Sequence, residues 1–235
     1  MTEIFNPLTN QQLPAGRPNG WVILDRSWAR VLGVQRDRGV SRIRHSQLLK
    51  KLESPDAYPP PGRWEIDPAH TSVGFVAPHL RIAKVRGGFR EVSGTVSLGP
   101  TPAESWVDVT VQTASIDTGQ PVRDAHLRSE DFLDAANHPQ MRFRSTGMEV
   151  VGTRSCKLTG DLTIRGVTRP VTLDLSYLGT ATDHSGDPKV VFEASARIDR
   201  EEFGLVWNRV LEAGGVLVGR HIELQIEAQA VPAAA

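Results

Sequence analysis

The sequence predicts an all-β protein: an extended eight-stranded antiparallel barrel with a short helical lid, preceded by a small N-terminal extension. From residue 64 onward, apolar and polar side chains alternate in one stretch after another, with the period of two typical of half-buried strands. No βαβ spacing appears in this part of the chain, so the sheet should be antiparallel. The stretches run to about ten residues or more, which favours a tall barrel over a sandwich, and closing the barrel protects the sheet edges.

Composition narrows the function classes. The chain has 235 residues, enough for one large β domain or for a domain with an appendage. Lys plus Arg and Asp plus Glu both number 27, and this balance argues against a nucleic-acid partner. The hydrophobic content of 39% is low but suffices for a barrel, where only every second strand residue must be apolar. The single cysteine, Cys156, allows no intramolecular disulfide.

The N-terminal sequence suggests a location. Residues 1–16 contain neither the basic region nor the apolar region that a secretory signal needs. No apolar run approaches the ~20 residues of a membrane span. We therefore expect a cytoplasmic protein without a membrane span.

Charge and proline divide the chain into two parts. Residues 1–62 contain nine Lys and Arg against five Asp and Glu, whereas residues 63–235 contain 18 against 22. Three consecutive prolines in residues 54–62 predict a stiff, extended linker. The prediction is a basic extension with a Pro-rich linker over residues 1–62 and a barrel over residues 63–235.

The extension contains little apolar material. Short apolar runs lie at residues 21–24, 31–34 and 40–43, the last two flanking a plausible turn at residues 36–39, and residues 46–52 could form one or two helical turns. This is too little for an independent core. The extension is either an appendage of the barrel or a basic docking arm for an acidic partner.

The barrel strands follow in order. Residues 84–98 form a long segment interrupted by glycines at 87, 88 and 94, which indicate bends or bulges. The strands before and after this segment each keep one apolar face, and the last strand has an arginine at the start of that face. These faces comprise Val73, Phe75 and Ala77; Leu158, Gly160, Leu162 and Ile164; Val171, Leu173, Leu175 and Tyr177; Phe192, Ala194, Ala196 and Ile198; and Arg220, Ile222, Leu224, Ile226 and Ala228.

One segment, residues 120–136, loses the strand period; we call it the helical insert. It lies between an alternating strand at residues 107–111 and another that begins at Met141. Ser129 followed by Glu130 and Asp131 predicts a helix N-cap with acids in the first turn. A helical excursion inside a strand pattern is best explained as a lid or plug over an apolar cavity.

Several of these stretches resemble a known family. The matching segments are WEIDPAHTSVGFVAPHL, VRGGFREVSGTVSL, SIDTGQPVRDAHLRSEDFLDAANHPQMRFRST, GDLTIRGVTRPVTLDL and ARIDREEFGL. They resemble the YceI-like family of polyisoprenoid-binding proteins, from about residue 64 to residue 231. The resemblance implies a lipocalin-like barrel that holds a long isoprenoid or other lipid chain, with no enzymatic activity and no cofactor. Many family members are exported, whereas residues 1–62 fall outside the match.

The ligand expectation also has a physical basis. Burying an alkyl chain in a dry, apolar tube contributes ~0.8 kcal/mol per CH2, so a five-carbon isoprene unit could contribute up to roughly 4 kcal/mol before ordering costs. The alternative is an interior filled by the barrel's own side chains. The predicted tail contacts are the residues of the inferred inward faces and of the helical insert: Phe75, Val109, Ile116, Leu127, Phe132, Phe143, Leu173, Phe192 and Ile222.

Polar candidates lie near the predicted ends of the tube. His79 follows the inward register of its strand and could donate a hydrogen bond to a ligand carbonyl or phosphate. Arg123, His126 and Arg128 form a polar cluster on the helical insert, where an arginine could meet a pyrophosphate or quinone head group. The alternative is salt bridging of these arginines with Asp124, Glu130 or Asp131.

Two further positions belong to the ends. Trp207, with Phe203, lies in an irregular stretch that could form the second rim. Arg220 either ends its strand at the barrel mouth or pairs with an acid inside.

Metal and nucleophilic chemistry find little support. The histidines show no H-x-x-x-H spacing, which leaves only a ligand set assembled in space, and we predict no metal site. There is no G-x-S-x-G motif, and Cys156 has no neighbouring histidine in sequence.

The predicted function is a non-enzymatic carrier of a polyprenyl chain or an isoprenoid quinone. A homodimer of this carrier is one expected form of assembly. One alternative is an enzyme that acts on an isoprenoid or other lipid with His79 or His126 as acid/base. Another is a regulatory module that works through residues 1–62.

Overall fold

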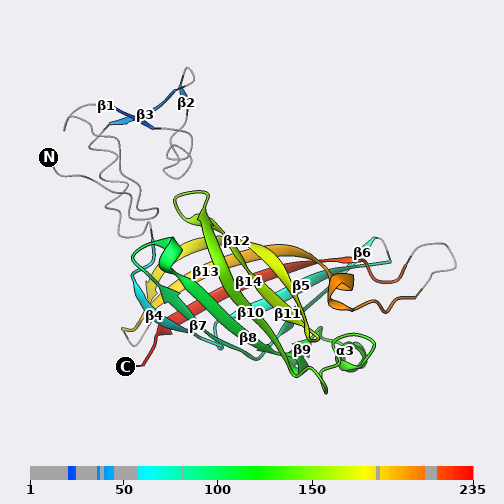
Figure 1. Cartoon of the computed structure of the whole chain (residues 1–235). Helices are drawn as coiled ribbons and strands as arrows, with labels where there is room; N and C mark the ends of the chain where they lie inside the picture. The colour runs from blue at the N-terminus through cyan, green and yellow to red at the C-terminus, as the bar shows by residue number, and fades with distance from the viewer. Residues whose placement is uncertain are drawn as a thin grey trace.

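The computed structural model describes residues 21–24, 36–37, 40–44, 58–80, 82–183, 186–209 and 216–234. The first three ranges form a small antiparallel sheet of β1 (Trp21–Leu24), β2 (Arg36–Asp37) and β3 (Val40–Arg44), in the order β1-β3-β2 (Figure 1). Of the three apolar runs in the extension, residues 21–24 and 40–43 therefore lie in strands. The apolar run at residues 31–34 and the helical turns predicted at residues 46–52 lie outside the described residues.

The remaining strands build one large antiparallel sheet (Figure 1). They are β4 (Gly62–Ile66), β5 (Ser72–His79), β6 (Ala83–Phe89), β7 (Val92–Leu98), β8 (Trp106–Gln112), β9 (Ile116–Asp117), β10 (Gln140–Val150), β11 (Ser155–Ile164), β12 (Val167–Thr182), β13 (Pro188–Asp199) and β14 (His221–Pro232). Short 3-10 turns are η1 (Pro102–Glu104), η2 (Thr113–Ser115) and η3 (Arg200–Phe203), and the described residues contain one α-helix, α3 (Pro121–Arg128).

The sheet closes into a barrel of eight strands. β4 with β5, β6 with β7, and β8 with β9 each act as one long strand that is broken in the middle, and β10 to β14 supply the other five. β14 pairs with β13 along one edge and with both β5 and β4 along the other, which completes the ring. The predicted all-β barrel with a short helix is confirmed.

The three broken strands are neighbours, and their breaks lie side by side. Val92 pairs with Val111 just after the break in β6/β7, whereas Phe89 pairs with Ile116 just before it. The peptides beside these two breaks are still hydrogen-bonded to each other, since Gln112 N donates to Glu91 O at 2.9 Å. We call this row of breaks, at residues 67–71, 90–91 and 113–115, the seam.

Two glycines in the barrel strands make room for aromatic rings instead of marking the predicted bends. The long segment breaks at residues 90–91, between the glycines rather than at them. Gly87 lies opposite Phe75, and a Cβ built on Gly87 would lie 2.6 Å from Phe75 Cζ. Gly160 leaves the same space for the ring of Phe143. These glycines let large aromatic rings lie across the neighbouring strand.

The predicted helix start at Ser129 is wrong. α3 begins at Pro121, whose ring fixes a helical φ at the first position, and Ser129 is its C-cap. Ser129 Oγ donates to His126 O at 2.8 Å, so its hydroxyl satisfies a carbonyl of the last turn. Glu130 and Asp131 follow the helix instead of opening it. A serine before acids fits either end of a helix, and here the proline decides.

A bulge in β10 changes which residues face inward. Met141 and Phe143 contribute to the interior from odd positions, and Met148 and Val150 contribute from even positions. The register shifts between Ser145 and Gly147. The wall therefore stays apolar on the inside along all of β10, although the simple alternation is interrupted.

Candidate functional site

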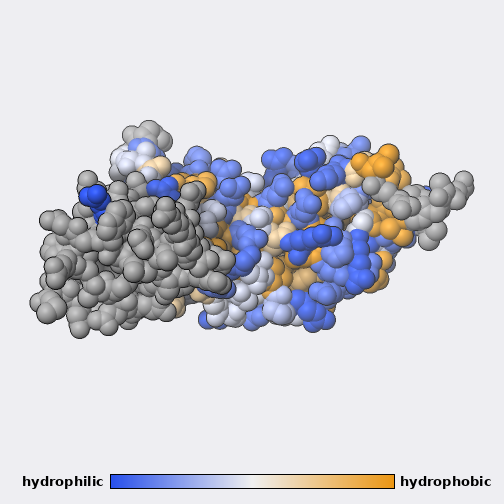
Figure 2. Space-filling model, turned by 90° about the horizontal axis from the view of Figure 1, so that it is seen from above, coloured by the Kyte–Doolittle hydropathy of each residue, from blue (hydrophilic) through white to orange (hydrophobic). Residues whose placement is uncertain are grey.

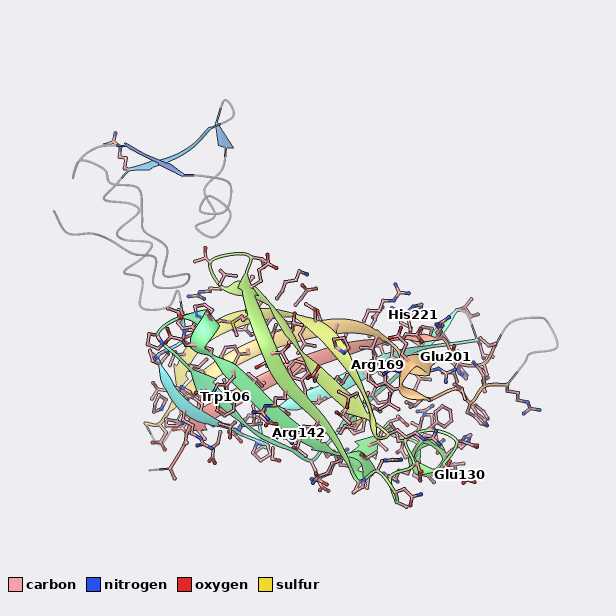
Figure 3. All side chains as sticks on the ribbon, in the orientation of Figure 1. Trp106, Glu130, Arg142, Arg169, Glu201 and His221 are labelled. Atoms are coloured by element: carbon pink, nitrogen blue, oxygen red, sulfur yellow. The ribbon has the colours of Figure 1, made fainter. Side chains whose placement is uncertain are left out.

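The barrel encloses a cavity of about 310 Å³. All eight strands contribute side chains to its lining, which is almost entirely apolar, whereas the outer face seen in Figure 2 carries many hydrophilic side chains among hydrophobic ones. Outward residues pair with each other across strands; for example, Arg142 Nε donates to Asp108 Oδ1 at 2.8 Å (Figure 3). The volume lies at the lower end of the range for small-ligand pockets. The alternative of an interior filled by its own side chains is therefore wrong.

The predicted tail contacts all line this cavity. The nine residues are Phe75, Val109, Ile116, Leu127, Phe132, Phe143, Leu173, Phe192 and Ile222. Ile116 and Phe132 are 2% and 6% exposed, so they also belong to the packed core. Their contact with a ligand stays a prediction.

The polar and rim candidates His79, Arg123, His126 and Trp207 do not line the cavity. His79 ends β5 and forms an isolated backbone bridge with Val218, so its strand contributes to the lining only as far as Ala77. Asp131 Oδ2 accepts a hydrogen bond from His126 Nε2 at 2.8 Å, and the His126 ring packs edge-on against Phe132 and Trp207, with centroids 5.0 and 4.7 Å away. These rings join the helical insert to the segment after η3.

The arginines of the helical insert hold backbone carbonyls. Arg123 donates to Thr118 Oγ1 at 2.7 Å and to Thr118 O at 2.9 Å. Arg128 donates to Ala114 O and Ile116 O, both at 2.7 Å. Asp124, which is 6% exposed, accepts hydrogen bonds from the amide and hydroxyl of Thr118. The two arginines therefore anchor α3 next to β9, whereas His126 pairs with Asp131, one of the acids named in the salt-bridge alternative. A head-group role for the arginines stays a prediction.

Arg220 lies outside the barrel. Its side chain is exposed and pairs with Asp199 at 2.6 Å and with Glu201 at 3.4 Å. These carboxylates raise the pKa of Arg220, chiefly through the hydrogen bond that Arg220 donates to Asp199. Of the two predicted settings, Arg220 therefore takes the strand end, where it pairs with acids at the surface.

A different arginine, Arg200 at the start of η3, lines the cavity. It is only 4% exposed. Its Nε donates to Gly219 O at 3.0 Å, and its Nη1 donates to Leu205 O. Burial lowers the pKa of Arg200, against the opposing charges of Glu201 and Asp199. Sequence reasoning missed this residue, although it continues the inward alternation of residues 192, 194, 196 and 198 by one step.

The end of the Pro-rich linker contributes to the lining. Tyr58 and Pro59 both line the cavity. The hydroxyl of Tyr58 bonds to Ser105 Oγ at 2.7 Å, and burial raises the pKa of Tyr58. The sequence pattern carries no sign of this contact, because the partners lie 47 residues apart.

Cys156 also lines the cavity. Burial raises its pKa to about 11, which keeps the thiol protonated at neutral pH and makes it a poor nucleophile. Over the described ranges, the structure holds no group of three or more His, Cys, Asp or Glu side chains suited to a metal ion. No helix in those ranges is both long and apolar enough to cross a membrane.

Comparison with known proteins places this barrel in a family. The model of the YceI-like domain matches residues 64–230, which is most of the chain. The chain belongs to the YceI-like domain family. Protein YceI of Escherichia coli O157:H7 is 39% identical to this YceI-like domain over 137 residues, which are 58% of this chain and 71% of the relative.

Solved structures share the fold of this YceI-like domain. The YCEI protein of Campylobacter jejuni, 32% identical, superposes with a TM-score of 0.58 over 66% of this chain and 90% of its own. A polyisoprenoid binding domain from Saccharophagus degradans superposes with a TM-score of 0.54 over 72% of this chain and 98% of its own. At 13% identity, the second similarity concerns the fold alone.

Proposed function

We propose that this protein is a non-enzymatic carrier that holds an isoprenoid-type lipid, either a polyprenyl chain or an isoprenoid quinone, inside the barrel. The observation that carries the proposal is the apolar cavity of about 310 Å³, which the chain does not fill itself. Each buried CH2 of a guest would contribute ~0.8 kcal/mol, and therefore a long hydrocarbon chain needs few polar contacts to bind tightly.

The comparisons support the same proposal. The chain is a YceI-like domain, and a protein described as a polyisoprenoid binding domain has the same barrel. The nine predicted tail contacts lie on the inner surface, where such a chain would lie.

A carrier fits the site better than an enzyme does. The acid/base candidates His79 and His126 are absent from the cavity lining, and His126 is engaged by Asp131. The thiol of Cys156 reaches the cavity but stays protonated. These positions offer a bound lipid no activated nucleophile and no histidine at the cavity wall.

The test is native mass spectrometry of the gently purified full chain, followed by organic extraction. We expect a bound mass that extraction releases as a prenyl lipid of unchanged structure. Apo protein should also take up added geranylgeraniol or a short-chain isoprenoid quinone. An apo mass throughout, with no uptake of either compound, would contradict the carrier function; conversion of the added compound would favour the enzyme.

A further inference from the structure

Arg200 stands apart among the buried polar groups of the described ranges. Three side-chain groups there are buried without a hydrogen-bond partner: Trp64 Nε1, Thr113 Oγ1 and Arg200 Nη2. Of these three residues, Arg200 alone lines the cavity. Buried donors are nearly always paired, so a donor left open at a cavity wall indicates a partner that enters with a ligand.

The guanidinium is held in place from two sides. Gly219 O, in the segment before β14, accepts from Nε at 3.0 Å, and Leu205 O, after η3, accepts from Nη1. Because a guanidinium is planar and rigid, these two carbonyls fix the direction of Nη2. The neighbouring lining residues Phe203 and Val218 are apolar. The open donor is therefore pre-oriented in dry surroundings, where a charge-assisted hydrogen bond is strong.

The charge of Arg200 is also incompletely compensated, because Glu201 and Asp199 act on it without forming an ion pair. The ion pairs of the described residues include none for Arg200, and the adjacent Asp199 is taken up by Arg220 on the outer side. A buried charge is costly unless a counter-charge or several hydrogen bonds compensate it. A neutral carbonyl would satisfy the donor, but only an anionic oxygen would also balance the charge.

We infer that Arg200 binds the polar head of the cargo, and that this head carries an anionic oxygen of a carboxylate or a phosphate. The inference rests on the proposed carrier function and deepens it. It also sets the direction of the ligand. The head lies at the end of the tube with η3 and the helical insert, and the tail extends toward Tyr58, which lines the same cavity.

The head end is identified by a bridging residue. Arg165 Nη1 donates to Phe132 O in the helical insert at 3.1 Å and to Gly204 O beside η3 at 3.3 Å. Glu130 and Glu201 accordingly lie at the same end of the barrel (Figure 3). Arg200, at the start of η3, therefore lies at the end of the tube that carries the helical insert.

The experiment compares ligands that share one chain and differ in the head. Full-length apo protein is loaded with the neutral fluorescent probe N-phenyl-1-naphthylamine, which is then displaced by geranylgeraniol, geranylgeranoic acid or geranylgeranyl phosphate. We expect one or both anions to bind about ten- to a hundredfold more tightly than the alcohol. The acid and phosphate arms distinguish the two sources of the anionic oxygen.

Variants assign the preference to one residue. Arg200→Gln should bring the three affinities to within about threefold while leaving that of the alcohol nearly unchanged. Arg220→Gln is the matched control, because it removes the same charge at the same end but outside the cavity, and it should keep the preference. If Arg200→Gln fails to fold, side-chain NMR of isotope-labelled arginine in the wild type gives the answer. The Arg200 signal should shift with the anion and not with the alcohol.

Each outcome of these experiments either supports or contradicts the inference. Equal affinities in the wild type, a preference that survives in Arg200→Gln, or an Arg200 signal that ignores the anion would overturn the inference and leave the carrier function standing. Failure of all three ligands to displace the probe would overturn the carrier function itself, and the inference with it.

Discussion

Asp67 connects two distant parts of the wall through a single carboxylate. It lies in the gap between β4 and β5, and Lys189 of β13 donates to its Oδ2 at 2.9 Å. His70 bonds to the same oxygen at 2.8 Å. The side chains of Asp67 and Lys189 are only 14% and 12% exposed. The hydrogen bond from Lys189 is the main reason that the pKa of Asp67 falls to about 2.

This lowered pKa gives stability a defined pH dependence. The pKa of Asp67 is lower in the folded state than its ordinary value of 3.8, so its contribution is complete above about pH 4 and is lost as the pH falls through about 2. We expect Asp67→Asn to lower the free energy of unfolding at pH 7 by about 1–2 kcal/mol, a value reduced for partial solvent screening.

Urea unfolding at pH 7, 4 and 2 checks this expectation, since the difference between wild type and variant should shrink over the lowest interval. Asp174→Asn is the control, because the Lys157–Asp174 pair is exposed and should contribute less than about 1 kcal/mol. A difference that stays constant from pH 7 to pH 2 would show that the charge of Asp67 is not what stabilises the fold.

The sequence alone does not predict which arginine is buried at the site. The alternation draws attention to Arg220, which begins an apolar face, yet the structure turns Arg220 to the surface and Arg200 to the interior. Both residues lie just beyond a strand, where η3 or an irregular segment replaces the strict period of two. Which of two such side chains is buried depends on carbonyl partners that are distant in sequence.

Pairs of strands depend on glycine and aromatic residues that face each other. Gly87→Ala would place a methyl group 2.6 Å from both Phe75 Cζ and Thr118 Cγ2. We expect a loss of about 1–3 kcal/mol in the free energy of unfolding, because the Phe75 ring and the Thr118 side chain must shift from their packed positions. Thermal or urea unfolding measures it.

A second substitution identifies the cause. Phe75→Leu shortens the ring side chain, so Gly87→Ala should cost less in that background than in the wild type. Gly147→Ala is the matched control, since a Cβ there meets no atom within 4 Å. Strict additivity of the two substitutions would show that contact with Phe75 is not responsible.

The helical insert is anchored by a buried carboxylate. Asp124→Ala would leave the amide and hydroxyl of Thr118 without their partner. We expect a loss of about 1–3 kcal/mol and faster protease cleavage within residues 120–136. Glu130→Ala, at an exposed position of the same segment, should change neither measurement. Equal cleavage rates for both variants would contradict the anchoring role.

Elements were predictable where a local pattern suffices. The long alternating strands β11 to β14 and the tight turn at Arg165 and Gly166 follow from the residues themselves. The seam does not, because its breaks are set by pairing between neighbouring strands. The helix start was missed because Ser129 satisfies the residue preferences of either end.

Over the whole molecule, the closed wall determines what the interior can hold. Ala194 is 5% exposed and lines the cavity between Leu175 and Ile226. We expect Ala194→Phe to fill part of the tube and to lower the affinity for geranylgeraniol at least about tenfold, at a cost of about 1–3 kcal/mol in stability. Probe displacement and urea unfolding measure the two effects.

The neighbouring position provides the control. Ser195 is exposed on the outer face of the same strand, so Ser195→Phe should leave the affinity unchanged. Unimpaired binding by Ala194→Phe would mean that the ligand does not occupy this part of the cavity.

Closure and the apolar inner surface were predictable, because every strand repeats the same two-sided pattern. The packing of Tyr58 and Pro59 against the cavity was not, because linker residues carry no such pattern. The division at residue 62, a docking role for residues 1–62 and a homodimer stay predictions.

The seam makes the two halves of the wall unequal. β10 to β14 keep long, nearly continuous ladders, whereas the ladders of β4 to β9 are interrupted in one transverse row. Deuterium should therefore enter the backbone amides beside residues 67–71, 90–91 and 113–115 well before it enters the centres of β12 and β13. The half of the wall formed by β10 to β14 should therefore be the more rigid one, and local opening of backbone hydrogen bonds should concentrate along the seam.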